Sequence, residues 1–132
     1  MKKSNIILTV IVLLVVGVVV GAGIFGLVRK ANQPGKYDTL AQCISDSGAK
    51  FYGAFWCPHC QATKAMFGKS AKLLPYVECS KPSGQGQLPI CDEQGIKGYP
   101  TWRFADKSEL GGERSLAELA DKTNCSVPTA TQ

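Results

Sequence analysis

The sequence Phe55-Trp56-Cys57-Pro58-His59-Cys60 places two cysteines three positions apart, directly after an apolar run. That run, from Lys50 to Trp56, is expected to form a mostly buried strand. A helix is expected to begin around Cys57-Pro58, because the fixed φ angle of proline suits the first helical turn. Two cysteines within one turn at such a junction can close a small disulfide ring with little backbone movement. The motif therefore predicts a redox-active cysteine pair.

The two cysteines are expected to have different roles. Cys57 is predicted to lie at the helix N-terminus, where unpaired N–H groups and the helix dipole favour an anion. Its thiolate is therefore the expected nucleophile. A protonated His59 adds positive charge beside it, and Pro58 fixes the start of the helix. Cys60, one turn further along, is expected to resolve a mixed disulfide formed on Cys57.

Other uses of a Cys-x-x-Cys pair fit this sequence less well. A zinc site needs a second pair of ligands at similar spacing, whereas Cys79 and Cys91 are twelve positions apart with no histidine nearby. A covalently attached haem needs a histidine directly after the second cysteine, and Gln61 stands there. A purely structural disulfide does not require a position between a strand and a helix. We therefore predict neither a metal nor a cofactor.

The pattern around the motif predicts strands that alternate with helices, followed by a closing hairpin and a last helix. This order is typical of an α/β fold with a small mixed sheet flanked by helices. The expected elements are a helix capped by Asp38, a strand over 50–56, a helix from Cys57 with Ala62, Ala65, Met66 and Leu73 on one face, a strand over 76–79, a short helix within 90–96, strands over 101–104 and 109–114, and a helix that begins with the capping box Ser115 to Glu118 and runs toward Thr123.

The N-terminal part has a different composition. Ile6 to Val28 is a run of 23 residues without charge, long enough as a helix to cross the roughly 30 Å core of a bilayer. We predict an uncleaved transmembrane anchor in residues 1–30, a linker over 31–37 and a domain over 38–132. A cleaved signal peptide is the alternative, although Gly21-Ala22-Gly23 is a poor cleavage site and the apolar run continues past it.

The charge and the cysteine content bear on partners and location. The net charge is +5, but four of the 15 basic residues flank the apolar run and the remaining basic residues nearly balance the ten acidic ones. Because no basic cluster with interleaved aromatics follows the anchor, we predict no nucleic-acid binding. Six cysteines in a membrane-linked chain favour an oxidising compartment. The short tail before the span also favours a domain on the extracytoplasmic side, although Lys2-Lys3 and Arg29-Lys30 give the two ends equal charge.

The motif of residues 55–60, followed by Gly98-Tyr99-Pro100-Thr101, resembles a thioredoxin-fold oxidoreductase. The resemblance implies that Pro100 is cis and packs beside the cysteine pair. It also implies that the backbone of Tyr99, with Trp56 nearby, receives an extended segment of the substrate by strand addition. Without the resemblance, Pro100 would be an ordinary strand-initiating proline.

A narrower resemblance covers most of the predicted domain. Phe51 to Gln61, Pro89-Ile90-Cys91 and Gly98 to Trp102 are similar to the thioredoxin-like domain of bacterial and plant vitamin K epoxide reductase homologues. It implies a dithiol oxidase that takes electrons from thiol-containing exported proteins and passes them to a quinone-reducing membrane partner of that type. The implied location is the periplasm or the thylakoid lumen. Many members carry a buried acid where this chain has Phe51, so a proton acceptor for Cys60 is unassigned.

Two alternative functions differ in how they would use Cys57 and Cys60. A membrane-tethered disulfide reductase would use Cys57 and Cys60 with the electrons flowing the other way. A non-catalytic, disulfide-stapled interaction domain would not use their reactivity at all. The sequence does not identify the substrates or the direction of electron flow.

Four further cysteines are expected to form structural disulfides. Cys79 and Cys91 bracket a loop rich in Gly, Ser and Pro, and a bridge between them would restrain it. An auxiliary redox relay is the alternative for that pair. Pairing Cys43 with Cys125 would tie the two ends of the domain together, but the spacing also allows crossed pairings and free thiols.

Overall fold

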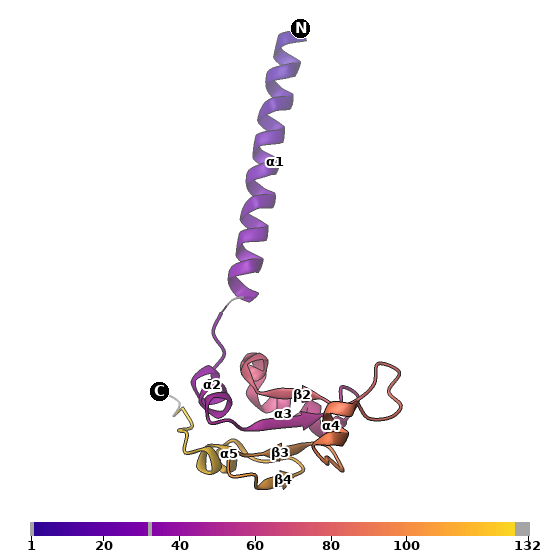
Figure 1. The fold of residues 1–132 in the computed structure, drawn as a ribbon. Helices are drawn as coiled ribbons and strands as arrows, with labels where there is room; N and C mark the ends of the chain where they lie inside the picture. The colour runs from indigo at the N-terminus through magenta and orange to yellow at the C-terminus, as the bar shows by residue number, and fades with distance from the viewer. Residues whose placement is uncertain (1, 32, 129–132) are drawn as a thin grey trace. The chain divides into compact units, whose positions relative to one another are not determined.

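The computed structural model describes residues 2–31 and 33–128, and the chain divides into two compact units, Met1–Gln33 and Pro34–Gln132. The first unit is the helix α1, Lys2–Ala31 (Figure 1). Within it, Asn5–Lys30 is long and apolar enough to cross a membrane, and none of its most apolar window is buried in the protein. A helix that is apolar on all sides suits a lipid environment. By length and composition, α1 is therefore a candidate membrane span.

The second unit is a four-stranded mixed sheet with helices around it, so the predicted fold class is confirmed. The sheet order is β2-β1-β3-β4, in which β1 and β2 are parallel while β3 is antiparallel to both β1 and β4. The elements are α2 Asp38–Asp46, β1 Lys50–Gly53, α3 Pro58–Phe67, the 3₁₀ helix η1 Gly68–Leu73, β2 Tyr76–Glu78, α4 Pro89–Glu93, β3 Thr101–Arg103, β4 Glu109–Gly111 and α5 Leu116–Thr123.

The core of the domain is built on β1. Phe51 pairs in register with Tyr76 on one side and with Trp102 on the other. Its ring stacks on Trp102 with centroids 4.6 Å apart and meets the Tyr76 ring edge-on at 5.2 Å. Leu40 of α2 and Leu119 of α5 are fully buried in the same core. Buried aromatic pairs of this kind stabilise a domain beyond the area that they remove from water.

Helix α3 buries a different face from the predicted one. Cys60, Thr63 and Phe67 are buried, whereas Ala65 is exposed. The helix begins at Pro58, which turns Cys60 toward the sheet and brings positions three and seven residues later to the same side. It ends at Gly68, whose φ of +55° is one that most side chains disfavour. Leu73 therefore belongs to the separate helix η1.

Other boundaries also differ from the predicted ones. β1 ends at Gly53, because Ala54 to Trp56 already turn toward α3. Asp38 lies in the first turn of α2 and Tyr37 holds the cap position, where no side chain caps the helix. The Asp38 carboxylate instead accepts a hydrogen bond from the N–H of Gly35 at 3.0 Å.

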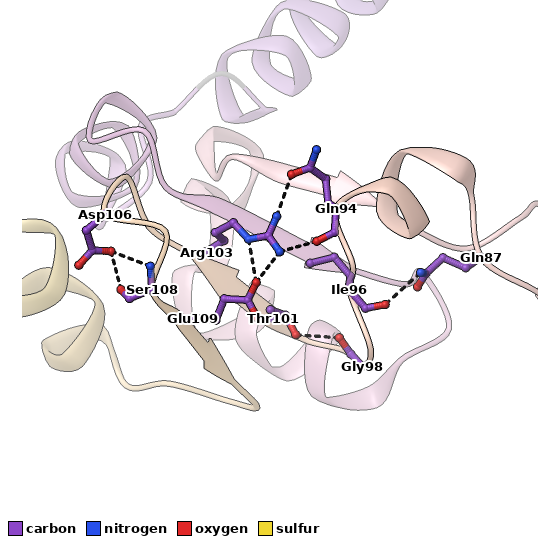
Figure 2. Close-up of polar contacts among 9 residues, drawn as sticks. All are labelled: Gln87, Gln94, Ile96, Gly98, Thr101, Arg103, Asp106, Ser108 and Glu109. Carbon is purple, nitrogen blue, oxygen red and sulfur yellow. Dashed lines mark hydrogen bonds and ion pairs between the residues drawn. The ribbon is translucent and has the colours of Figure 1, made fainter.

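Polar contacts hold the segment that precedes β3 (Figure 2). Arg103 of β3 donates to the side chain of Gln94 at 2.8 Å and pairs with Glu109 of β4. The Gln87 amide donates to the carbonyl of Ile96 at 3.0 Å, and the Thr101 hydroxyl donates to the carbonyl of Gly98 at 2.8 Å. These bonds attach the segment of residues 94–98 to β3 and to the loop before α4, and the Arg103–Glu109 pair joins β3 to β4.

Two disulfides link distant parts of the domain. One joins Cys43 of α2 to Cys125 after α5, across a sequence separation of 82 residues. The other joins Cys79 to Cys91 across a separation of 12. Both sulfurs of the second bridge belong to fully buried residues, so the loop of residues 80–90 is attached to the sheet at both of its ends.

Candidate active site

Cys57 and Cys60 are the two free cysteines of the described part of the chain. Cys57 is the N-cap residue of α3, and its sulfur accepts a hydrogen bond from the N–H of Cys60 at 3.4 Å. Only 4% of Cys57 and 1% of Cys60 is exposed. The capping position directs the unpaired N–H groups of the first helical turn toward the Cys57 sulfur. That arrangement stabilises negative charge on Cys57 more than on Cys60.

The surroundings of Cys60 favour the neutral thiol. The pKa of Cys60 is raised to about 12. Burial is the largest cause, and the hydrogen bond with Cys57 acts in the same direction. The ammonium group of Lys64 acts in the opposite direction but more weakly. At neutral pH, Cys60 therefore stays protonated and needs a base before it can attack a disulfide.

The peptide bond between Tyr99 and Pro100 is cis, and it lies against the cysteine pair. The Cys57 thiol is 3.7 Å from the Tyr99 carbonyl oxygen, to which it donates. Pro100 is fully buried, whereas Tyr99 is half-buried. The backbone just before Pro100 thus lies against the reactive sulfur.

Exposed aromatic rings lie beside the pair. About half of Phe55 and of Trp56 is exposed. The Trp56 ring meets the Tyr99 ring edge-on at 6.1 Å, and its indole N–H donates to the Ser80 hydroxyl at 2.7 Å. Tyr99 in turn donates from its hydroxyl to Gln87. The loop closed by Cys79 and Cys91 therefore fixes both rings.

His59 is mostly exposed, and its Nδ1 lies 2.5 Å from Oε1 of Glu113. Glu113 comes from the segment between β4 and α5, 54 positions away in the sequence. His59 therefore has a partner that the motif itself did not predict.

The thioredoxin family model matches residues 37–124 of the chain. The chain belongs to the thioredoxin family. Thiol-disulfide oxidoreductase LTO1 of Arabidopsis thaliana is 46% identical over 97 residues, which cover 70% of this chain and 26% of that protein. Protein disulfide-isomerase 1 of Dictyostelium discoideum is 28% identical over 116 residues, which cover 74% of this chain and 31% of that protein. Human protein disulfide-isomerase A2 is 37% identical over 59 residues, which cover 42% of this chain and 11% of that protein.

The chain spans about a third or less of the length of these relatives. Similarity to a thiol-disulfide oxidoreductase and to protein disulfide-isomerases supports an oxidoreductase for this thioredoxin-family domain.

The thioredoxin-family site brings together residues that the sequence predicted and others that it did not. Cys57, Pro58, His59 and Cys60 lie at the start of α3, and Trp56, Tyr99 and Pro100 lie around them. Glu113, Ser80 and Gln87 reach the site from distant segments without a motif of their own. The four remaining cysteines lie in the two disulfides and not at the free pair.

Proposed function

We propose that this chain is a membrane-anchored thiol–disulfide oxidoreductase in which Cys57 is the nucleophile and Cys60 is the resolving cysteine. The observation that carries the proposal is the asymmetry of the pair, because Cys57 caps α3 beside the Tyr99 carbonyl whereas Cys60 is buried as a thiol. Pro58 starts the helix. The contact with Glu113 holds the His59 ring two positions after Cys57.

The proposed reaction is a two-electron exchange. A substrate thiolate attacks Cys57 of the Cys57–Cys60 disulfide, a mixed disulfide forms, and Cys60 leaves with the electron pair and takes up a proton. A second substrate thiolate then attacks the substrate sulfur of the mixed disulfide. The substrate leaves oxidised, and Cys57 leaves as a thiolate.

The proposed binding surface for the substrate consists of Trp56 and the backbone before Pro100. An extended peptide can add to that backbone by hydrogen bonds, as in other strand-addition complexes. The exposed rings of Phe55 and Trp56 offer an apolar surface beside it. A substrate that exposes a cysteine in an extended apolar segment fits this surface.

We further propose that the reduced pair passes its electrons to a quinone-reducing membrane protein of the vitamin K epoxide reductase type. The support is the resemblance of residues 51–61, 89–91 and 98–102 to the domain that serves such enzymes, together with a candidate span in α1. The two disulfides of the domain support a location on the extracytoplasmic side.

Trapping of covalent partners tests this function. In the full chain, Cys60→Ala removes the resolving thiol, so mixed disulfides through Cys57 should accumulate in cells and separate on non-reducing gels. Cys57→Ala is the matched control and should abolish them. Mass spectrometry of the trapped partners should find exported proteins and a quinone-reducing membrane protein.

Two results would contradict parts of the proposal. Trapping a dedicated reductant in place of the quinone-reducing protein would reverse the direction of electron flow and favour the tethered reductase. Finding no Cys57-dependent complex in either background would leave a stapled, non-catalytic domain.

A further inference from the structure

Cys60 needs a proton acceptor, and the described neighbours of its sulfur limit the choice. Phe51, on the strand beneath the pair, carries no group that accepts a proton, and its ring lies between Trp102 and Tyr76. The groups that act on the Cys60 charge are Cys57, the Ala54 backbone and Lys64, and Cys60 itself acts on Tyr76 and Tyr99.

Gly53 shows how closely Tyr76 approaches Cys60. A Cβ atom on Gly53 would lie 3.0 Å from the Cys60 sulfur, 3.4 Å from the Tyr76 hydroxyl and 2.7 Å from Cε2 of the same ring. The sulfur and the hydroxyl therefore border the same small space, which is open only because residue 53 has no side chain. Any larger residue there would have to displace the Tyr76 ring.

The Tyr76 hydroxyl leads to a carboxylate. It donates a hydrogen bond to Oε2 of Glu78 at 2.8 Å. The other carboxylate oxygen, Oε1, accepts from the N–H groups of Ser80 at 2.8 Å and Phe55 at 3.2 Å. Glu78 is thus held at the end of β2 with one oxygen directed at Tyr76.

Lys64 of α3 also contacts Tyr76. Its ammonium nitrogen lies 3.2 Å from the centroid of the Tyr76 ring. The same cation acts on Cys60, where it favours the thiolate and so lowers the pKa of that cysteine. Burial of the hydroxyl, followed by its bond to Glu78, raises the pKa of Tyr76, so the hydroxyl stays protonated between turnovers.

We propose that Tyr76 and Glu78 form a proton relay for Cys60, a role that rests on the proposed oxidoreductase function. When the reduced pair is reoxidised, Cys57 forms a mixed disulfide with the partner. The Cys60 thiol then gives its proton to the Tyr76 hydroxyl, which passes its own proton to the Glu78 carboxylate. The Cys60 thiolate attacks Cys57, the Cys57–Cys60 bond forms, and the partner sulfur leaves with the electron pair. When a substrate opens the disulfide, the proton returns to Cys60 by the same path.

The test separates the two sulfur steps in the reduced full chain in detergent. Dithiobis(nitrobenzoate) releases one coloured thiolate when Cys57 attacks it and a second when Cys60 resolves the adduct. Stopped-flow absorbance therefore gives one rate for each cysteine. Glu78→Gln keeps an acceptor for the Phe55 and Ser80 N–H groups but cannot take the proton, and Tyr76→Phe removes the hydroxyl while keeping the ring.

Both variants should slow the second phase about 100-fold at pH 7, as loss of a general base does, and leave the first phase within about twofold. Their second phase should also rise about tenfold per pH unit, because hydroxide must then remove the Cys60 proton. Glu93→Gln, at an exposed carboxylate of α4, and Tyr52→Phe, on the neighbouring strand, are matched controls and should behave as the wild type.

The other outcomes contradict either the relay or the oxidoreductase function, and the result shows which of the two is wrong. An unchanged second phase in both variants, or a slower one with the wild-type pH profile, would overturn the relay and leave the oxidoreductase function intact. Absence of the first phase in the wild-type chain would overturn the proposed function itself. If Tyr76→Phe loses its circular dichroism spectrum, Glu78→Gln alone decides the result.

Discussion

Cys57 and Cys60 lie one helical turn apart, yet the physical chemistry around them differs. Cys57 receives the N–H groups at the start of α3, whereas Cys60 faces the buried side of the helix. The raised pKa of Cys60, caused first by burial, means that the folded chain holds this proton through the neutral range. The fold therefore favours the thiol form of Cys60. The contribution of this thiol to the free energy of unfolding is complete below the ordinary pKa of a cysteine and is lost as the pH rises from there toward 12.

This difference predicts a pH-dependent selectivity toward alkylating agents. Cys60→Ala retains Cys57, and Cys57→Ala retains Cys60. At pH 7 the retained Cys57 should react with iodoacetamide at least about 10-fold faster than the retained Cys60. The rate at Cys60 should still be rising above about pH 8.5, because burial, the largest cause of its raised pKa, does not depend on the Cys57 sulfur. Mass spectrometry of timed samples measures both rates, and a plateau for Cys60 near pH 8.5 would contradict the account of its burial.

The secondary-structure elements show how much the local pattern determines. The order of helices and strands followed from the alternation of apolar runs with turn residues, and the Ser115 to Glu118 capping box is present as the sequence indicated. The buried face of α3 could not be predicted from this pattern, because it depends on where Pro58 starts the helix and where Gly68 ends it. Residues such as Glu113, Tyr76 and Glu78 carry no motif, since only the folded register brings them to the cysteines.

Helix α5 offers a direct test of that local pattern. The Ser115 hydroxyl accepts from the Glu118 N–H at 3.1 Å, and the Glu118 carboxylate accepts from the Ser115 N–H at 2.9 Å. Ser115→Ala should lower the free energy of unfolding by about 1 kcal/mol, as measured by urea denaturation of the full chain in detergent. Ser126→Ala, at an exposed serine beyond the helix, is the matched control. Equal effects of the two substitutions would show that the box contributes nothing specific.

The capping box also has a pH dependence with a definite sign. The hydrogen bonds from Ser115, first from its backbone N–H and then from its hydroxyl, hold the pKa of Glu118 below its ordinary value. A carboxyl whose pKa is lowered in the fold stabilises it above the unfolded pKa and loses that contribution as the pH falls through the folded one. The contribution of Glu118 should therefore decline below about pH 4.

At the scale of the domain, the two disulfides restrict the unfolded chain to different extents. A loop as long as the one closed by Cys43 and Cys125 is expected to stabilise the fold by about 4.5 kcal/mol, and the shorter one closed by Cys79 and Cys91 by about 3 kcal/mol. Single domains of this size have total stabilities of about 5–15 kcal/mol. A compartment that keeps these cysteines reduced would therefore remove a large share of the stability.

That dependence leads to a prediction about the side of the membrane on which residues 34–132 lie. If α1 crosses the bilayer, the domain should face an oxidising compartment, because only there do the two disulfides persist. Protease added to cells whose outer barrier has been opened should cleave the domain after the disulfides are reduced, and a cytoplasmic marker protein should stay intact as the control. Maleimide labelling of such cells without a reductant should miss Cys43, Cys79, Cys91 and Cys125, because all four lie in disulfides. Cleavage that requires lysis of the inner membrane, together with labelling of those four cysteines, would place the domain in the cytoplasm and contradict the proposed export of its substrates.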